Sequence, residues 1–310
     1  DLSHLLWFAI DPHESSIRDD AIALHTDAEG NKWILVSVAD PVRHFRPGSP
    51  LDQDAQARAT SIYFGSQYLA LFPRDFLVAC SIMDGRRNAT LTVGYRMDDT
   101  GNVADYVVFP SVIQKICHIP ITSSLVPLPG SQGLLLEDAA RSYSAELTTT
   151  ASNDLRALMK LAPTQKLSTE AKEPLGNELS RFVATVMRAC RHAVGLHLIK
   201  HGISREFISR QSHTGNEQVW VTSPLRSYET VLNHYLLHST ILQDDEHKYL
   251  LESALDEKVR RAVRNRTAAC RNIARHLEED GARDGGTRPP NVTVSESERS
   301  PRGGVVPNRT

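Results

Sequence analysis

Short apolar segments separated by polar turns recur over the first 115 residues, a pattern typical of β-strands. Many of the apolar positions are β-branched, and Gly30-Asn31 stands between two segments as a hairpin signal. The pattern therefore predicts a sheet, with strands over residues 5–11, 21–26, 32–40, 89–97 and 104–109.

One segment in this part has helical character. Residues 50–63 contain good helix formers, and they follow Ser49, a suitable N-cap, with Pro50 at the first helical position. We expect a helix that ends near Tyr63 and crosses one face of the sheet.

From about residue 135 the apolar positions recur at helical spacing, which predicts helices over residues 136–161, 175–201, 224–238 and 247–279. Strands followed by helices are typical of the α+β class. We expect a mixed β-sheet core in the N-terminal half, packed by helices mainly from the C-terminal half. Residues 280–310 are rich in Gly, Pro, Ser and Arg, so a disordered tail is expected after a domain of residues 1–279.

Composition narrows the class of protein. The 310 residues hold 35 basic and 37 acidic side chains, which argues against a basic protein that wraps duplex DNA. Of the basic residues 27 are Arg, which suits bidentate phosphate contacts and leaves room for a local basic channel. No apolar run reaches the roughly 18 to 20 residues needed to span a bilayer. Four widely spaced cysteines without a C-x-x-C pair favour a reducing, intracellular compartment, cytoplasmic or organellar such as the mitochondrion.

Three carboxylates form the first candidate site. Asp11 ends a predicted strand, and Asp19 and Asp20 lie on the loop that follows. Carboxylates placed in this way can converge on Mg²⁺, which favours phosphate chemistry. The alternative is a solvated turn at Asp19 and Asp20 with Asp11 capping a local group, and the spacing alone favours that alternative.

The second candidate is the segment T-S-P-L-R-S-Y. Ser223 is a suitable N-cap, Pro224 would be the first helical residue, and Arg226 would lie in the first turn. A cation there opposes the helix dipole unless an anion occupies the same terminus, so free amides and a guanidinium together indicate a phosphate site. An exposed Arg226 paired with an acid such as Glu229 is the alternative.

Other candidates are less specific. Tyr63 either stacks on an unpaired base or belongs to the core. Residues 258–274 carry five Arg and no acid, which indicates either a solvated basic face or part of an RNA path. His197 and His201 are four residues apart on a predicted helix, but a third ligand is missing there, so metal binding is not expected.

Four blocks in order carry a family resemblance: AIDPHESSIRDDAIAL, VSVADPVRHFRPGSPLDQDAQARATSIYF, LFPRDFLVACSIMDGRRNATLTVGYRMDDTGNV and VWVTSPLRSYETVLNH. Together they resemble the RNB catalytic domain of the ribonuclease II and ribonuclease R family. The resemblance implies an RNB-like fold and a Mg²⁺-dependent exoribonuclease that shortens single-stranded RNA from its 3′ end, releasing nucleoside 5′-monophosphates.

The resemblance also implies roles for individual residues. Asp11 and Asp20 would hold Mg²⁺, Asp19 would be tied to activating the attacking water, and Arg226 would stabilise charge on the scissile phosphate. Tyr63 would clamp the terminal nucleotides, with Ser223 as a further RNA contact. RNA-binding domains that flank the family's catalytic domain lie outside this chain, so flanking domains or partner proteins are expected to supply contacts.

Two positions depart from the family pattern. Ile17 stands where the family has another acidic residue, which neither His13 nor Glu14 replaces in register, and Thr230 stands where the second signature has Asp. Loss of a carboxylate from a metal site lowers the rate, roughly by a decade or more. The alternative function is therefore a catalytically weakened RNA-binding module. A metal-dependent hydrolase of small phosphate esters explains less, because it leaves the second signature and Tyr63 without a role.

Overall fold

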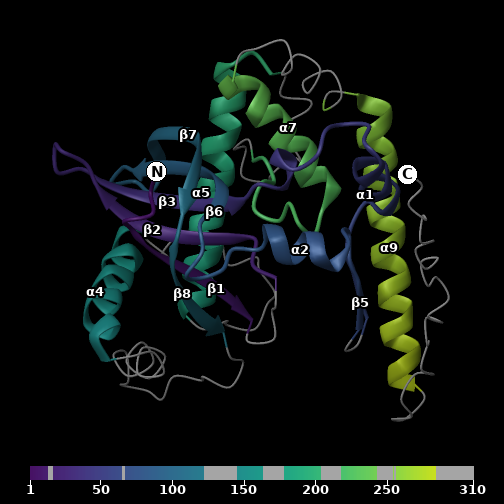
Figure 1. The fold of residues 1–310 in the computed structure, drawn as a ribbon, viewed down its shortest axis with the longest axis horizontal. Helices are drawn as coiled ribbons and strands as arrows, with labels where there is room; N and C mark the ends of the chain where they lie inside the picture. Colours follow the sequence, from purple (N-terminus) through teal and green to yellow (C-terminus); the bar gives the residue numbers. More distant parts are fainter. Residues whose placement is uncertain are drawn as a thin grey trace, which may run out of the picture.

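A six-stranded sheet forms the centre of the computed structural model (Figure 1). The strands are β1 Leu6–Pro12, β2 Asp20–Thr26, β3 Lys32–Ala39, β6 Asn88–Met97, β7 Val103–Ile113 and β8 Lys115–Ile121. Their order is β7-β6-β3-β2-β1-β8, and all neighbours are antiparallel except β1 and β8, which are parallel. The expected mixed sheet is confirmed. The structure describes residues 1–12, 17–64, 67–121, 145–162, 178–203, 218–242, 254 and 256–283.

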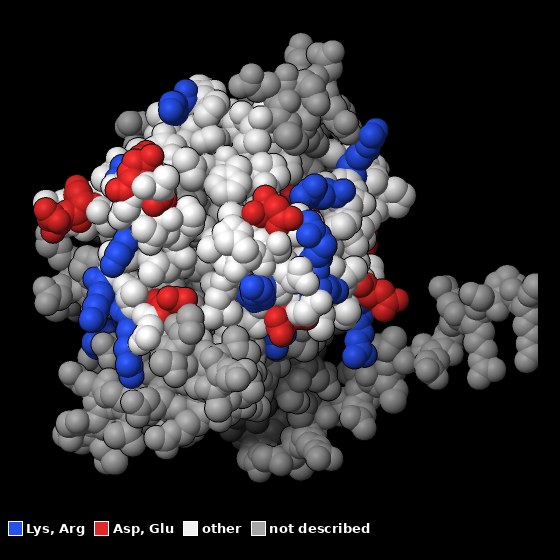
Figure 2. Space-filling model, turned by 60° about the vertical axis from the view of Figure 1, so that its left-hand side comes forward, with Lys and Arg blue, Asp and Glu red and all other residues white. Residues whose placement is uncertain are grey.

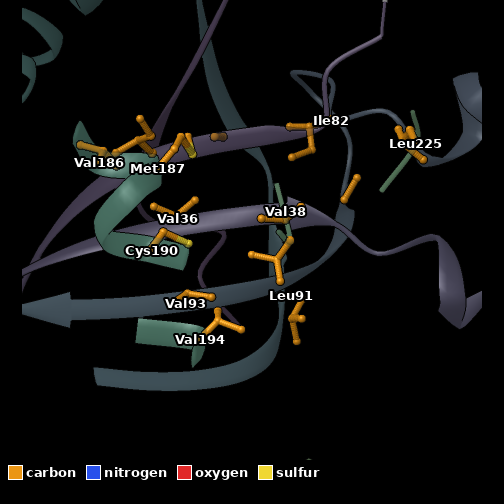
Figure 3. Packing of buried hydrophobic residues seen from close by; sticks show 14 of the residues in the cluster. Val36, Val38, Ile82, Leu91, Val93, Val186, Met187, Cys190, Val194 and Leu225 are labelled. Carbon is orange, nitrogen blue, oxygen red and sulfur yellow. The ribbon is translucent and has the colours of Figure 1, made fainter. Parts of the chain in front are cut away.

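Helix α5, Glu178–Lys200, covers one face of this sheet. Because side chains alternate along a strand, Val36 and Val38 of β3 point to the same face, where α5 residues such as Cys190 and Val194 pack against them (Figure 3). The Tyr95 hydroxyl on β6 donates to the carbonyl of Val186 on α5 at 3.0 Å. Helix α4, Ala145–Leu161, contacts β2.

The remaining elements lie together beyond one end of the sheet (Figure 1). They are η1 Pro41–Arg43, α1 Pro50–Arg58, the hairpin β4 Ile62–Phe64 and β5 Gln67–Leu69, α2 Arg74–Cys80, α7 Tyr228–Leu242 and α9 Glu257–Arg283. Buried Asp52 on α1 accepts hydrogen bonds from the hydroxyls of Tyr228 and Tyr235 on α7, at 2.8 and 2.9 Å. These bonds fix α1 against α7 although the two helices lie more than 170 residues apart in the chain.

The first helix is shorter than predicted. Ser49 does cap it, accepting from the Asp52 amide, but the helix ends at Arg58 because Ala59 has a positive φ of 65°. Tyr63, predicted at the end of this helix, lies instead on strand β4. Ser61 explains the change, because its amide donates to the carbonyl of Arg226 at 2.9 Å and not to a helical carbonyl.

Other boundaries also differ from the prediction. Helix α9 continues to Arg283, past the expected domain boundary at residue 279, and β4, β5, α2 and β8 were not predicted. Parts of the predicted helices at residues 136–144, 175–177 and 247–253 lie outside the described residues, as do residues 284–310 of the predicted tail. In the part of the chain that the structure describes, no helix is long and apolar enough to cross a membrane. The four cysteines are free thiols.

Candidate active site

The three predicted carboxylates lie at one end of the central sheet. Asp11 is near the end of β1, and Asp19 and Asp20 are at the start of β2. Because β1 and β2 are antiparallel neighbours, the end of one strand lies beside the start of the other. Asp40 follows β3 at the same end, where the Ala39 amide donates to the Asp19 carbonyl at 2.7 Å. The solvated-turn alternative is wrong for Asp19, because its side chain is 0% exposed.

Asp19 meets the second candidate segment across the fold. One carboxylate oxygen accepts from the amide of Leu225 at 2.8 Å, and the other accepts from Nε of Arg226 at 2.6 Å. Both carboxylate oxygens therefore have charged or backbone partners, which is the condition for burying a charge at tolerable cost. The negative charge of Asp19 raises the pKa of Arg226, so the guanidinium stays charged.

The segment that carries Arg226 is a turn and not the first turn of a helix. The backbone carbonyl of Ser223 accepts from the amides of Arg226 and Ser227 at 3.1 and 3.0 Å. Helix α7 begins only at Tyr228. The predicted N-cap at Ser223 with helical residues from Pro224 is therefore wrong. The amide of Tyr228 donates to the carbonyl of Ala59 at 2.9 Å. This amide therefore does not bond to a carbonyl one helical turn earlier.

An anion does occupy this turn, although the turn is not the start of a helix. It is the protein's own carboxylate, Asp19, and not a ligand phosphate, because Asp19 takes the Leu225 amide. The side chain of Arg226 remains 39% exposed and can still reach a phosphate. The acid that pairs with Arg226 is thus Asp19 from the other candidate segment, whereas the sequence had offered Glu229 as its alternative partner.

The site is rich in negative charge. Burial, with the nearby charge of Asp19 adding to it, raises the pKa of Asp11 to about 6. Partial burial and the charges of Asp11 and Asp19 raise the pKa of Asp20 to about 8. Burial also raises the pKa of Asp19, and Arg226 and the Leu225 amide oppose that rise. These directions require the three carboxylates to lie within electrostatic reach of one another.

Asp11 and Asp20 fit a divalent cation. One carboxylate oxygen of Asp11, Oδ2, is buried and has no hydrogen-bond partner among the described residues, and burial together with the charges of Asp11 and Asp19 raises the pKa of Asp20. Among the described residues no group of three or more His, Cys, Asp or Glu side chains is arranged to hold a metal. Mg²⁺ is commonly held by one or two carboxylates with waters and substrate phosphates, so two acidic ligands are sufficient for it.

Tyr63 stands beside the site on β4. Its side chain is 51% exposed, and its ring stacks on that of Tyr68 with centroids 5.6 Å apart. The core alternative for Tyr63 is therefore wrong. Burial raises the pKa of the Tyr63 hydroxyl while the Arg226 charge opposes the rise, so the hydroxyl lies near the guanidinium.

A pocket of about 420 Å³ opens between β4 and α9. It is lined by Thr60, Ser61, Ile62, Tyr63, Cys270, Arg271, Ala274 and Arg275. Of the five Arg predicted on a basic face, Arg260 is instead buried and donates to Asn233 Oδ1 at 3.1 Å. Arg271 brings positive charge to the pocket beside Tyr63, as the RNA-path hypothesis expects. On the wider face in Figure 2, basic and acidic side chains lie interspersed, in keeping with the near-zero net charge.

Ile17, at the position of the expected fourth acid, is half-buried and packs against the hydrophobic core. Its environment is apolar, which suits isoleucine. His13 and Glu14 lie outside the described residues. Thr230 is buried near the start of α7.

Several residues near the site were not predicted. Buried Asp40 accepts from Nε2 of His238 at 2.9 Å, and Nδ1 of His234 lies 3.6 Å away. Burial alone would raise the pKa of Asp40, but the two imidazoles outweigh it and lower the pKa. His197, not expected to bind metal, lies 3.0 Å from the Thr240 hydroxyl. No local sequence pattern reveals these pairs, because their members lie far apart in the chain.

Comparison with known proteins finds similarity to ribonucleases. The RNB domain family model matches residues 1–124, which confirms the family resemblance for that part of the chain. A ribonuclease of Synechocystis sp., itself uncharacterized, is 32% identical over 115 residues, which is 37% of this chain and 17% of the relative. Other curated relatives named ribonuclease R or ribonuclease II are likewise covered only over 14 to 19% of their length.

Solved structures share the fold over most of the chain. A Mycoplasma genitalium RNase R in complex with double-stranded RNA matches with a TM-score of 0.72 and 16% identity, covering 90% of this chain and 65% of that chain. Yeast Ssd1, a pseudonuclease, matches with a TM-score of 0.57 and 16% identity, covering 88% of this chain and 43% of that chain. At these identities the likeness concerns the α+β fold, which the structure therefore shares with RNase R.

Proposed function

We propose that this chain is the catalytic part of a Mg²⁺-dependent exoribonuclease that removes nucleotides from the 3′ end of single-stranded RNA. The observation that carries the proposal is the pairing of Asp19 with Arg226 beside Asp11 and Asp20. The three acids come from the part of the chain that matches the RNB domain model. Arg226 joins them from a segment 207 positions after Asp19.

Each residue has a distinct part in the proposed reaction. Asp11 and Asp20 would hold Mg²⁺, which when bound would supply positive charge to the phosphate and make a water more acidic. Asp19 orients Arg226 through the 2.6 Å contact, and it is the carboxylate most directly tied to activating the attacking water. Arg226 stabilises the charge that develops on the scissile phosphate and the reaction releases a nucleoside 5′-monophosphate.

Tyr63 and the basic pocket beside it fit the 3′ end of a single strand. An exposed ring stacks on an unpaired base without regard to its identity, and Arg271 and Arg275 bind the backbone. Ser223 lies in the turn next to Arg226 and adds a polar contact to the RNA. Flanking domains or partner proteins supply further RNA contacts in this proposal. The match to the Synechocystis relative covers only 17% of that relative's length, which is consistent with such additional parts.

The direct test uses 5′-labelled single-stranded RNA, the 310-residue chain and Mg²⁺. We expect the RNA to shorten from its 3′ end in single-nucleotide steps, with nucleoside 5′-monophosphates as products and a duplex of the same sequence left intact. EDTA and Asp19→Asn should each abolish the shortening. Asp54→Asn is the matched control, because it removes a carboxylate from an exposed ion pair with Arg58.

A second candidate function is an RNA-binding module with little hydrolysis. Ile17 favours it, because a half-buried apolar side chain occupies the position of an expected active-site acid. Binding of RNA without shortening, with activity gained by Ile17→Asp, would favour the module over the enzyme. Absence of RNA binding at low salt would contradict both functions.

A further inference from the structure

Trp220 and Arg191 form a stacked pair outside the set of residues described for catalysis. The guanidinium carbon of Arg191 lies 3.7 Å from the centroid of the Trp220 ring, within the range of a cation–π interaction. The Trp220 side chain is 41% exposed, which is unusual for so large an apolar ring. One part of the ring is therefore covered by Arg191 while another part faces solvent.

The backbone holds this pair in a fixed position. The amide of Val219 donates to the carbonyl of Arg191 at 3.1 Å, which joins the Trp220 segment to α5. The carbonyl of Trp220 accepts from Nδ2 of Asn233 at 2.8 Å, and Nε2 of His234 lies 2.9 Å from the carbonyl of Val221. An exposed ring that is fixed in this way loses little entropy when a ligand stacks on it.

The same segment leads directly into the candidate active site. Leu225, whose amide binds Asp19, is five residues after Trp220, so the two Cα atoms are at most about 18 Å apart. On the other side, Arg191 follows Cys190 of α5, which packs against the sheet near Val36 of β3, the neighbour of β2 (Figure 3). The hydrogen bond between Val219 and Arg191 thus links the α5 side of the sheet to the segment that carries Arg226.

Arg191 has unused hydrogen-bonding capacity. Its Nε is buried and has no hydrogen-bond partner among the described residues, whereas Nε of Arg226 is satisfied by Asp19. A guanidinium carries five donors in a planar fork that matches the oxygens of a phosphate. An anionic ligand beside Trp220 would supply the acceptors that the protein does not.

We propose that Trp220 and Arg191 form a nucleotide subsite, in which the exposed part of the Trp220 ring stacks on one base of single-stranded RNA and Arg191 binds an adjacent phosphate. The subsite rests on the proposed function, since its ligand is the RNA whose end reaches the carboxylates. It differs from the Tyr63 pocket, which is built from β4 and α9, because its residues come from α5 and from the segment before Arg226. The base at this position is held by stacking and not by hydrogen bonds to its edge. No base preference is therefore expected.

The test measures RNA binding with EDTA present, so that cleavage does not interfere. Fluorescence anisotropy of a 5′-labelled RNA is recorded for a series in which a single abasic nucleotide moves from the 3′ end towards the 5′ end. For the wild-type chain, we expect one position to weaken binding by about 5- to 100-fold, the range of one base–aromatic stack. Trp220→Ala should weaken binding of the unmodified RNA by a similar factor and should lose its sensitivity to that one position.

Two further variants separate stacking from a structural role. Trp220→Phe should keep part of the sensitivity at the same position, because a smaller ring still stacks. Arg191→Gln should weaken binding and reduce its dependence on salt, since one phosphate contact is lost. The matched control is Arg96→Gln, which removes a guanidinium 5.1 Å from the Trp33 ring at the opposite end of β3 from Asp40 and should leave the binding profile unchanged.

The outcomes distinguish the subsite from the proposed function. If Trp220→Ala keeps the wild-type abasic profile, or weakens binding equally at all positions, the subsite is overturned. The proposed function still stands in that case if the wild-type chain shortens RNA in the presence of Mg²⁺. If the wild-type chain neither binds nor shortens RNA, the proposed function fails and the subsite fails with it.

Discussion

Arg226 donates through Nε to a carboxylate oxygen of Asp19 at a distance of 2.6 Å, although the two residues are 207 positions apart in the chain. Asp19 is fully buried, while the Arg226 side chain is 39% exposed. The contact thus fixes a guanidinium at the surface of the site through an anion beneath it. Catalysis and stability both depend on this pair, and substitutions there test the two together.

Asp19→Asn should stop RNA shortening, lowering the rate by at least about 100-fold, because the charge that orients Arg226 is lost. We also expect the free energy of unfolding to fall by about 2 to 3 kcal/mol, less than for a fully buried pair because Arg226 is partly exposed. Arg226→Lys should not restore activity, since an ammonium lacks the planar fork. The measurements are the labelled-RNA assay and urea unfolding. Full activity in Asp19→Asn would contradict the assigned roles.

Mg²⁺ binding should become tighter as the pH rises from 6 to 8. The pKa of Asp20 is raised to about 8 and that of Asp11 to about 6, so at pH 7 Asp20 is mostly protonated and must lose its proton to bind the cation. Calorimetry in buffers of different ionisation enthalpy should record proton release on Mg²⁺ binding at pH 7. Asp20→Asn should abolish the release, and an affinity independent of pH would contradict the assignment.

The same pKa values predict how stability without metal depends on pH. A carboxyl with a raised pKa in the folded state binds more protons there than when unfolded, so its contribution is present below pH 3.8 and is lost as the pH rises through the folded pKa. In EDTA we expect the free energy of unfolding to decline between pH 4 and pH 8 as Asp20 ionises. The decline should be smaller in Asp20→Asn. Urea unfolding at several pH values measures both.

His238→Ala should destabilise the fold by about 2 to 4 kcal/mol. Asp40 is 1% exposed, and its shortest contact, 2.9 Å, is to Nε2 of His238, so the variant leaves a buried carboxylate with only His234 at 3.6 Å. Urea unfolding at pH 7 is the measurement, and His4→Ala, at an exposed position, is the control. Equal stability of the two variants would show that Asp40 does not need its histidine partner.

Tyr63→Ala should weaken binding of single-stranded RNA by about 5- to 100-fold, while Tyr63→Phe keeps most of the affinity because its ring still stacks. Tyr68→Ala should have a smaller effect, since Tyr68 supports the Tyr63 ring and does not line the pocket. Anisotropy with EDTA present measures the affinities. A larger loss in Tyr68→Ala than in Tyr63→Ala would contradict the assigned stacking surface.

The salt dependence of binding reports on the basic pocket. Each phosphate contact contributes about 0.7 to the slope of log affinity against log salt for a single strand, so Arg271→Gln with Arg275→Gln should lower the slope by about 1.4. Arg87→Gln is the control, because Arg87 is exposed and paired with Asp1. An unchanged slope in the double variant would exclude these two residues from the RNA path.

Local patterns in the sequence predicted the elements that local forces determine. The short apolar strands such as β3 were found nearly to the residue, and the α+β class followed from strands first and helices after. The edge strand β8 was missed because it is defined by parallel pairing with β1, more than 100 residues away. Tyr63 was placed on a helix because the residues before it are good helix formers, while a bond from Ser61 to Arg226 places it on a strand.

The sequence named the candidate site residues but not the contacts between them. Asp11, Asp19, Asp20 and Arg226 were identified from motifs, yet the anion at the Arg226 turn proved to be Asp19, which local spacing does not reveal. Trp220 lies in the fourth of the blocks that carry the resemblance and Arg191 lies in none of them, so only the fold brings the two together. Residues that act through distant partners therefore require the structure.

The span of 207 residues between Asp19 and Arg226 has a consequence during synthesis of the chain. The strands that carry the acids are made first, whereas the guanidinium that neutralises Asp19 is made much later. A growing chain that has not reached Arg226 lacks the partner that makes burial of Asp19 tolerable, so the end of the sheet stays incomplete. The nascent protein can therefore acquire its candidate active site only after Arg226 has left the ribosome, and a chain interrupted before Arg226 has none.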